Sequence, residues 1–492
     1  MMGLFNLRRP KPRIAKSTSV RYIDLKSAHK PYYIVASVEV GNTTTKCILT
    51  ATNLKDGRAH MLTKIVKMTR DVRPPKPGED VFGMTLAGVE LTRESVAELV
   101  RDTLLEACAS VGLDIKEDLH FVVRSTGVVA GFSTPDEVGK IVHALADGCL
   151  MAGVPPSRMT PALSRHNLPK KFQPYTHIDK VAFDGAVAGV SPPVGATGVD
   201  LVANEMEGEL ATAGIKEGAK WAGVDFRNPV ISIDCGTTLD GRITNKDTPY
   251  AKTVGNFCGY AGAIADEIVK GTGAVDGRLG TALDLFSGSS GGISKIPKIL
   301  KEKVIGTYRD EVLEHVVVEK VPMGRDRYGS VPVNPSSAEK MGVVLIGCDV
   351  GVNGDEFSHL RKVGHEVYTE HGAGALAGLL DVVMAEVVAM LLRTADELGL
   401  VYPETNIGIT GRAGITGDKP ALILENIAAM GLFDKPEDHV VFVDDGLARG
   451  AAVMARCMNS LGTPHNPIGG VAGGRCVMGQ RMKLQRLQRG ER

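Results

Sequence analysis

Two segments of this 492-residue chain place an acidic residue, a glycine and adjacent threonines at the end of a β-branched run. The first reads Glu39-Val-Gly41-Asn-Thr-Thr-Thr45-Lys46, and the second reads Asp234-Cys-Gly236-Thr-Thr238. Glycine lets the backbone approach a ligand closely, and successive N–H groups form an anion-binding nest. We therefore expect each segment to be a tight turn between two strands that wraps a phosphate. Two such turns facing each other would clamp a nucleoside triphosphate.

The side chains of these turns suit phosphate and metal binding. A carboxylate at a strand end, Glu39 or Asp234, can hold a hydrated Mg²⁺, and Lys46 can reach phosphate oxygens as a point charge. The expected nucleotide contacts are Gly41, Asn42, Thr43, Thr44, Thr45, Gly236, Thr237 and Thr238. Two other interpretations stay open: a hairpin turn whose geometry Gly41-Asn42 sets, and an Asp234 that hydrogen-bonds only its own turn. Asp240 offers a second acid.

A third segment, Asn406-Ile-Gly-Ile-Thr410-Gly411-Arg412-Ala-Gly414, reads as a strand, a glycine-rich turn and a helix start. Such a turn leaves room for a flat adenine and brings a helix N-terminus near anions. The expected contacts to the nucleotide are Gly411, Arg412 and Gly414. The alternative is a glycine-rich loop without a ligand.

Composition limits the partners and the compartment. Lys+Arg and Asp+Glu are equal at 57 each, which argues against nucleic acid as the main partner. The eight cysteines are scattered, so reduced thiols in a cytoplasmic protein are expected. The N-terminus lacks the apolar region of a signal peptide. The most apolar long stretch, Ala373–Leu392, contains Asp381 and Glu386, so it is predicted to be a buried helix and not a membrane span.

Strand-like and helix-like runs alternate along the chain, which is typical of α/β architecture. The predicted strands are Tyr33–Val40, Lys46–Ala51, Phe121–Ser125, Val230–Asp234, Val343–Cys348, Asn406–Thr410 and Val440–Val443. The repeated turn predicts two related lobes, residues 31–225 and 226–461, with the nucleotide in the cleft between them. Residues 1–30 are expected to be a basic disordered arm, about 287–340 a peripheral insertion, and 462–492 a glycine-rich basic tail.

The three segments, in this order, resemble the phosphate 1, phosphate 2 and adenosine motifs of the actin/Hsp70/sugar-kinase ATPase superfamily. The resemblance covers roughly residues 31–461 and implies two ribonuclease-H-like lobes with ATP and Mg²⁺ between them. It casts Asp234 as the acid that orients the metal and the attacking water, with Lys46 on the phosphates. Glu39, a further expected catalytic and metal-binding residue, stands where the superfamily usually has aspartate.

Within the superfamily, Val40–Leu49 resembles the start of activators of 2-hydroxyacyl-CoA dehydratases and benzoyl-CoA reductases, and the middle of the chain resembles activators of corrinoid proteins. The dehydratase and reductase activators hold a [4Fe–4S] cluster between two subunits, so a homodimer is possible for this chain. Asn256–Gly262 is similar to one such cysteine site around Cys258, but the second cysteine is missing at the expected distance, and no cluster is expected here.

The stretch Val66–Gly78 and the helix after it resemble the methanogenesis marker protein 14 family of methanogenic archaea. That resemblance implies ATP-dependent maturation or reductive reactivation of a client metalloenzyme of methanogenesis, with methyl-coenzyme M reductase a candidate by analogy. Two alternatives remain: a small-molecule kinase with the same cleft, and a non-catalytic nucleotide-sensing scaffold, which Glu39 favours. Asp349 is expected to edge the cleft or cap a turn, and Asp266 or Glu267 to contact ribose.

Overall fold

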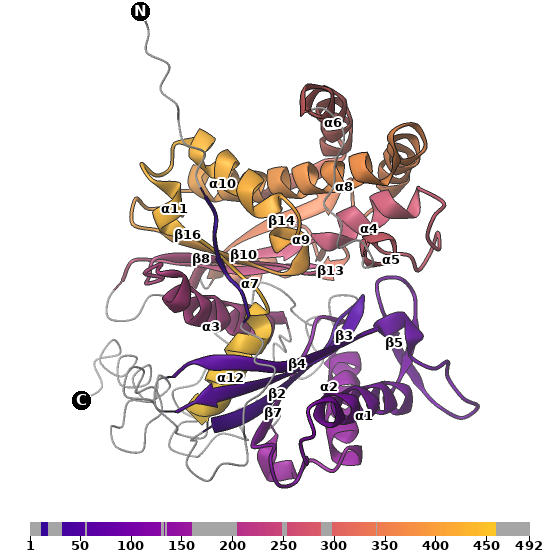
Figure 1. Cartoon of the computed structure of the whole chain (residues 1–492). Coiled ribbons are helices and arrows are strands. Elements are labelled where there is room, and N and C mark those ends of the chain that lie inside the picture. The colour runs from indigo at the N-terminus through magenta and orange to yellow at the C-terminus, as the bar shows by residue number, and fades with distance from the viewer. Residues whose placement is uncertain are drawn as a thin grey trace, which may run out of the picture.

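Two large sheets with helices packed on them make up most of the fold, and they lie one above the other in Figure 1. The computed structural model describes residues 11–17, 32–54, 57–128, 132, 135–159, 204–247, 253–286, 298–340 and 342–458. The predicted α/β class is confirmed, since strands of both sheets alternate with helices along the chain. The predicted tail, 462–492, lies outside the described residues.

The first sheet contains four strands in the order β4-β3-β2-β7. Their bounds are β2 (Tyr32–Val40), β3 (Thr44–Asn53), β4 (Ala59–Met68) and β7 (Phe121–Thr126). The pairs β2–β3 and β3–β4 are antiparallel, and β2–β7 is parallel. Helices α1 (Arg93–Ser110) and α2 (Pro135–Met151) cover one face and share its apolar core. Thr92 begins α1 with a capping box to Ser95, which satisfies free amides of the first turn.

The second sheet contains eight strands in the order β1-β16-β15-β8-β9-β10-β14-β11. Their bounds are β1 (Arg13–Ala15), β8 (Val230–Cys235), β9 (Leu239–Thr244), β10 (Thr253–Gly259), β11 (Val316–Lys320), β14 (Val344–Val350), β15 (Asn406–Thr410) and β16 (Val440–Val443). The run β10-β9-β8-β15 repeats the pairing of the first sheet, with two antiparallel pairs followed by a parallel pair. The two sheets therefore share one strand connectivity around the two predicted turns.

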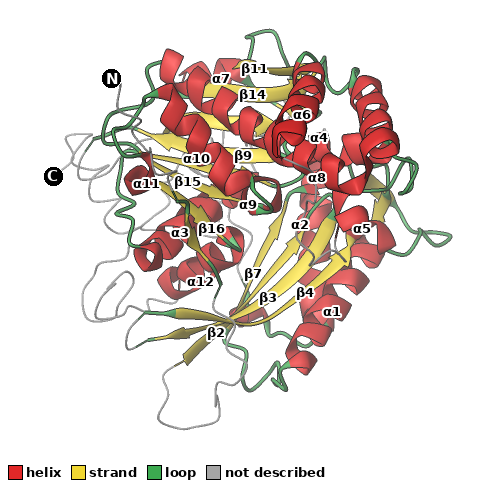
Figure 2. Ribbon diagram, turned by 45° about the horizontal axis from the view of Figure 1, so that its top comes forward, coloured by secondary structure: helices red, strands yellow, loops and turns green. Residues whose placement is uncertain are grey.

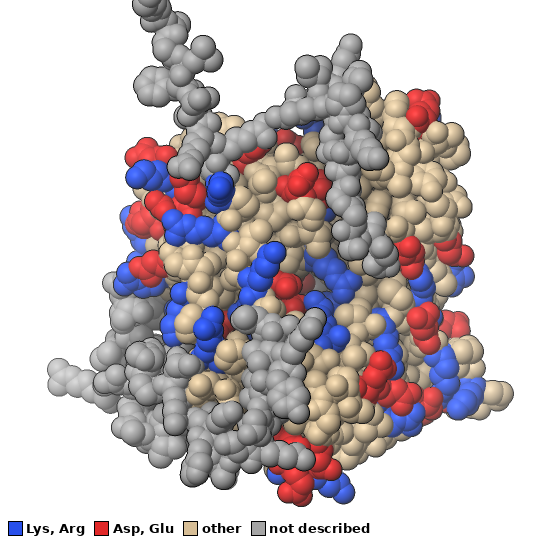
Figure 3. Space-filling model, viewed as in Figure 1, with Lys and Arg blue, Asp and Glu red and all other residues tan. Residues whose placement is uncertain are grey.

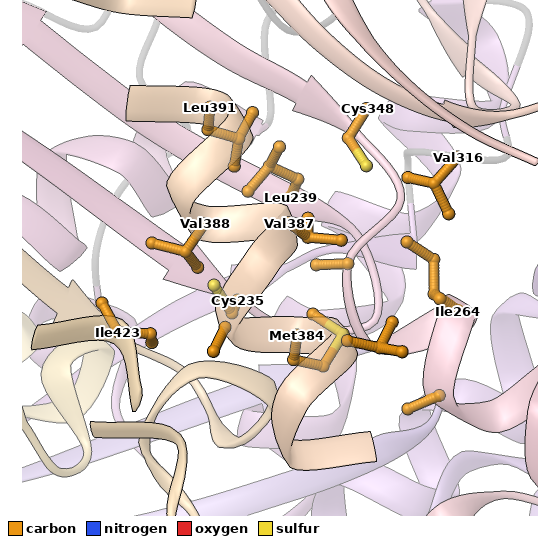
Figure 4. Close-up of a cluster of buried hydrophobic side chains, with 14 of the residues drawn as sticks. Cys235, Leu239, Ile264, Val316, Cys348, Met384, Val387, Val388, Leu391 and Ile423 are labelled. Atoms are coloured by element: carbon orange, nitrogen blue, oxygen red, sulfur yellow. The ribbon is translucent and has the colours of Figure 1, made fainter. Parts of the chain in front are cut away.

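The long helix α8 (Phe357–Glu397) fills the core above the second sheet. Gly372 interrupts it with a φ of 78°, so a separate apolar segment begins at Ala373, where the sequence predicted a helix start. Met384, Val387 and Leu391 face the β-sheet residues around Cys235 and Leu239 (Figure 4). Among the described residues α8 is the one helix long and apolar enough to cross a membrane, and 83% of its most apolar window is buried inside the protein.

Two helices lie between the sheets, and each packs on the sheet assigned to the other predicted lobe. Helices α3 (Asn204–Ala222) and α12 (Gly446–Met458) lie side by side there (Figures 1 and 2). Ile215 and Ala219 of α3 pack on β8 and β16 of the second sheet. Ala451 and Ala455 of α12 pack on β2 and β7 of the first sheet. The boundary expected at residue 225 therefore does not separate the two packing units.

Two segments differ from the sequence expectation. Arg13–Ala15, placed in the basic arm, form β1 and pair in parallel with Val441–Val443 of β16. Part of the expected peripheral insertion is also integrated, because β11 pairs with β14 as a strand of the second sheet and Tyr328 is fully buried. The lysines and arginines that suggested a solvated arm do not prevent pairing, because Arg13 donates to the Gly223 carbonyl and contacts Asp438.

The remaining elements are short or peripheral to the sheets. They are η1 (Thr69–Asp71), β5 (Val81–Met84), β6 (Glu90–Thr92), η3 (Pro156–Arg158), α4 (Gly262–Lys270), α5 (Ala282–Phe286), α6 (Lys298–Leu313), β12 (Arg327–Tyr328), β13 (Val331–Pro332), α7 (Pro335–Lys340), α9 (Arg412–Ile415), α10 (Lys419–Met430) and α11 (Pro436–His439). Of these, α4, α5, α9 and α10 contribute to the site described next.

Candidate functional site

Each of the two predicted turns joins a pair of antiparallel strands. In the β2–β3 hairpin the Gly41 amide donates to the Thr44 carbonyl at 3.0 Å, and the register places Glu39 opposite Lys46. In the β8–β9 hairpin the register places Asp234 opposite Asp240. The chemistry-bearing side chains thus sit at the ends of strands, as the sequence predicted.

The two turns meet across the space between the sheets. The hydroxyl oxygens of Thr43 and Thr237 lie 2.8 Å apart. Around this contact is a cavity of about 460 Å³ lined by residues of both sheets. The predicted site residues that line it are Glu39, Gly41, Asn42, Thr43, Thr44, Lys46, Asp234, Gly236, Thr237, Thr238, Gly411 and Arg412. Segments far apart in sequence therefore form one site.

Two predicted contacts, Thr45 and Gly414, are not among the residues that line the cavity. Thr45 is fully buried, and its hydroxyl lies 3.0 Å from that of Thr69. An added Cβ at Gly414 would lie 2.8 Å from Cγ2 of Ile409 and 3.2 Å from the Cys235 sulfur, so glycine allows this close packing. Asn42 lines the cavity, but its amide also donates to the Gly127 carbonyl at 2.8 Å and accepts from the Leu86 amide.

Asp234 is a buried carboxyl that faces the cavity. It is 7% exposed, and no side-chain hydrogen bond or ion pair of Asp234 is found within the described part of the chain. Burial, and after it repulsion from Glu39, raises the pKa of Asp234 to about 7, while the charge of Lys46 acts in the opposite direction. A buried carboxylate without a partner is costly unless a ligand, a metal or a proton compensates it. Asp234 therefore marks this cavity as a binding site.

Lys46 lies against Glu39. Its ammonium is 3.1 and 3.2 Å from the two carboxylate oxygens of Glu39. Burial lowers the pKa of Lys46, but the Glu39 carboxylate outweighs that effect and holds the pKa above its ordinary value. The lysine therefore stays charged at neutral pH. Because both Glu39 oxygens hold Lys46, a metal at Glu39 would compete with this ion pair.

Gly411 shows why the third segment needs glycine at its turn. Its φ is 83°, and a side chain there would lie 2.4 Å from a carboxylate oxygen of Asp234. The backbone of the turn after β15 thus packs closely against the turn between β8 and β9. This places Arg412, the next residue, beside the same end of the cavity.

Sequence reasoning missed two ion pairs that line the cavity. Lys419 lies 2.6 Å from Asp381, and both are more than nine-tenths buried. Lys64 of β4 lies 2.5 Å from Asp445, which links the first sheet to the start of α12. The signal for the second pair was present, because Asp444-Asp445-Gly446 follows a β-branched run in the same pattern as the two turns. Lys419 and Asp381 lie far apart in sequence, so no local sequence pattern predicted that they pair.

The remaining acids divide into those at the cavity and those elsewhere. Asp266 lines the cavity, and burial raises its pKa to about 7. Glu267 faces away and pairs with Lys270 and Arg361. Asp349 accepts from the Asn353 and Gly354 amides, which is the turn-capping role, and it does not line the cavity.

The side chains that line the cavity suit Mg²⁺, which keeps several waters, better than they suit a metal ion that is bound by protein ligands alone. Within the described ranges no group of three or more His, Cys, Asp or Glu is arranged to hold a metal ion. Mg²⁺ usually takes one or two carboxylates and completes its shell with water and phosphate oxygens. Asp234 suits that role because it is buried, faces the cavity and has no observed partner. Cys258, by contrast, is 1% exposed in a small core with Tyr328.

An ion pair between Arg70 and Asp284, here called the clasp, connects the first sheet to α5. The guanidinium of Arg70, after β4, makes two 2.6 Å bonds to Asp284 of α5 and donates to the Leu279 carbonyl at 2.7 Å. Nearby, Arg278 donates to the Gly88 carbonyl at 3.1 Å. Leu283 and Phe286, on the same short helix as Asp284, line the cavity. The clasp therefore joins the two sheets through a cavity wall.

We expect the Arg70–Asp284 pair to contribute a coupling energy of about 1 kcal/mol, at the upper end of the range for partly exposed pairs. A double-mutant cycle with Arg70→Ala and Asp284→Ala, measured by urea unfolding at pH 7, gives this value. The bond to Arg70 lowers the pKa of Asp284, so the coupling is lost as the pH falls through that lowered pKa. The exposed pair Arg101–Asp102 is the matched control. Equal coupling energies in the two cycles would contradict a stabilising role for the Arg70–Asp284 pair.

Charged residues of both signs are interspersed on the face shown in Figure 3. Lys and Arg do not gather there into one continuous basic surface of the kind that tracks a nucleic-acid backbone. This distribution agrees with the equal totals of 57 basic and 57 acidic residues in the sequence.

Comparison with known proteins gives relatives of nearly full length. The chain is 55% identical over 484 residues to an uncharacterized protein of Methanocaldococcus jannaschii, with 98% of this chain and 97% of the relative covered. It is 54% identical over 492 residues to an uncharacterized protein of Methanothermobacter thermautotrophicus, with 97% and 90% covered. Among solved structures, a reductive activator for corrinoid, iron-sulfur protein aligns with 13% identity and a TM-score of 0.31. That alignment covers 93% of this chain and 66% of the activator chain.

The family assignment comes from the sequence. Residues 32–485 match the family described as "Uncharacterized protein conserved in archaea (DUF2114)". The match covers the first sheet, the second sheet except β1, the two turns and the glycine-rich segment after β15. This chain belongs to that conserved archaeal family.

Proposed function

We propose that the protein binds ATP with Mg²⁺ in the cavity between its sheets and hydrolyses it. The observation that carries the proposal is Asp234, a buried carboxyl without an observed partner that faces a cavity lined by two glycine–threonine turns. The shared strand connectivity supports two ribonuclease-H-like lobes, since hairpin pairs followed by a parallel strand recur in both sheets. The turns would hold the phosphates from opposite sides.

In this proposal each side chain acts on a stated atom. Thr43, Thr44, Thr237 and Thr238 donate to phosphate oxygens, and Lys46 contacts them as a fixed charge. Asp234 orients a water for in-line attack on the γ-phosphorus and accepts its proton. The P–O bond to the β-phosphate breaks, and ADP leaves with the negative charge. Mg²⁺, when bound beside Asp234, would offset phosphate charge.

A pKa of about 7 suits Asp234 to this task, because a base works best when its pKa lies near the working pH. Glu39 serves in two ways in the proposal. The two carboxylate oxygens of Glu39 hold the Lys46 ammonium at 3.1 and 3.2 Å. When phosphate oxygens bind the lysine instead, one Glu39 oxygen can turn toward Mg²⁺. Because a glutamate side chain is longer than that of aspartate, Glu39 can reach both Lys46 and Mg²⁺ from the end of β2.

We also propose a role for ATP hydrolysis. We infer that ATP-driven movement of the two lobes activates a client metalloenzyme of methanogenesis in the archaeal cytoplasm, with methyl-coenzyme M reductase the candidate by analogy. The resemblance to activator proteins and to the methanogenesis marker protein 14 family supports this part. A homodimer is compatible with the same resemblance.

The test measures thermal stability and phosphate release with Mg-ATP, Mg-ADP and Mg-GTP. We expect Mg-ATP at a hundredfold excess over Kd to stabilise the protein by roughly 2.7 kcal/mol, with slow release of phosphate. Formation of ADP that depends strictly on an added metabolite would indicate the kinase instead. A stability shift without phosphate release would indicate the nucleotide-sensing scaffold, and the absence of both would overturn the ATPase proposal.

A further inference from the structure

The cavity contains four cationic side chains, and three of them are already paired. They are Lys46, Lys64, Arg412 and Lys419. Lys46 pairs with Glu39, Lys64 with Asp445 and Lys419 with Asp381. No ion pair or side-chain hydrogen bond of the Arg412 guanidinium is found in the residues that the structure describes. Its positive charge is therefore available to a ligand in the cavity.

Arg412 also lies at the phosphate end of the cavity. The residue before it, Gly411, packs so closely on the Asp234 carboxylate that an added side chain would lie 2.4 Å from an oxygen. The charge of Arg412 lowers the pKa of Lys46, whose nearest charged partner is Glu39. Arg412 thus shares its surroundings with the lysine and the two acids of the turns. The cavity also has apolar lining, which comes from several elements, among them Leu283 and Phe286 of α5 and Leu380 of α8.

We propose that Arg412 is a catalytic residue that binds γ-phosphoryl oxygens and stabilises the negative charge that moves to the leaving ADP oxygen. This inference rests on the proposed ATP hydrolysis and extends it. A planar guanidinium presents several donors in a fixed fork and suits phosphate oxygens. An arginine that meets the transferring group in the transition state lowers the barrier more than it strengthens binding of the ground state.

The role differs from the adenosine contact that the sequence suggested for Arg412. A contact to adenosine acts on ATP and ADP equally, because both carry the same base and ribose. A contact to the γ-phosphoryl group is absent in ADP. Binding of ADP therefore separates the two roles, and turnover reports only on the second.

The experiment compares the wild type with Arg412→Ala and Arg412→Lys in the full chain. We expect both variants to bind Mg-ADP within about threefold of the wild-type Kd, and phosphate release by Arg412→Ala to fall about 100-fold or more. Millimolar guanidinium added to Arg412→Ala should restore part of the release, which a purely structural role would not permit. Arg309→Ala, at an exposed arginine paired with Asp310, is the control and should behave as the wild type.

Two results would overturn the assignment while leaving the proposed ATPase intact. The first is phosphate release by Arg412→Ala at the wild-type rate. The second is a loss of Mg-ADP binding in parallel with the loss of release, which would mean that Arg412 contacts the adenosine. If the wild type itself neither binds nor hydrolyses ATP, both proposals fall together. Circular dichroism and the unfolding midpoint of each variant show that the fold is kept.

Discussion

Phosphate release is expected to fall by about 10²- to 10⁴-fold when Asp234 is replaced with asparagine, because the variant loses the base for the attacking water. The amide keeps the size of the side chain, so the cavity keeps its shape. Steady-state phosphate release with saturating Mg-ATP measures the effect. Asp310→Asn, at an exposed acid, should leave release unchanged.

The same substitution is expected to stabilise the fold at alkaline pH. The pKa of Asp234 is about 7 in the folded protein and about 3.9 in an unfolded chain. Ionisation of the buried carboxyl therefore opposes folding: the cost is absent below pH 4, grows between pH 4 and 7, and is complete above pH 7. A pKa difference of about three corresponds to roughly 4 kcal/mol.

Urea unfolding of the wild type and Asp234→Asn at pH 4 and pH 8 checks the sign. The two proteins should have similar stability at pH 4, and the variant should be more stable at pH 8. A variant that is less stable at pH 8 would mean that Asp234 contributes to the fold through a structural bond. Loss of turnover with gain of stability is the signature of a residue kept for chemistry.

The second large effect is expected where α3 crosses α12. A side chain at Gly214 would lie 1.7 Å from the Gly446 carbonyl oxygen and 2.8 Å from the Gly450 amide nitrogen. These are backbone atoms, so the two helices would have to separate. We expect Gly214→Ala to destabilise the protein by about 3 kcal/mol, measured by urea unfolding.

Gly306→Ala is the matched control for this prediction. Gly306 also lies inside a helix, α6, but nothing lies within 4 Å of the position of an added side chain. Alanine is the better helix former, so this variant should gain about 0.5–1 kcal/mol. Opposite signs for the same substitution would establish that contact between the helix backbones, and not helix propensity, decides stability at the crossing.

The sequence was most informative where function depends on a continuous segment. Both turns and the glycine-rich segment after β15 were found because each carries its residues within a dozen positions of a β-branched run. The helix start at Ala373 could be predicted as well, since Gly372 ends the preceding periodic pattern. Thr45 was placed at the ligand because turn spacing does not tell which threonine faces inward.

Features that depend on distant partners could not be predicted. Lys419 and Asp381 are separated by 37 residues of ordinary helix and loop sequence, and their pairing follows from how α8 packs beside α10. Apolar periodicity does not say which sheet a helix covers, so the packing of α3 and α12 on opposite sheets could not be predicted. Strand β1 was hidden by its basic surroundings, because three residues carry too little pattern to outweigh composition.

The position of α12 has a consequence for how the chain acquires its structure during synthesis. Tyr33, Val35, Phe121 and Val123 of the first sheet are covered by Ala451 and Ala455, which the ribosome makes last among the described segments. At synthesis rates of about 5–20 residues per second, this apolar face stays uncovered by α12 for tens of seconds. During that time the nascent chain presents an apolar surface suited to chaperones, and this face of the first sheet is covered by α12 only after α12 emerges.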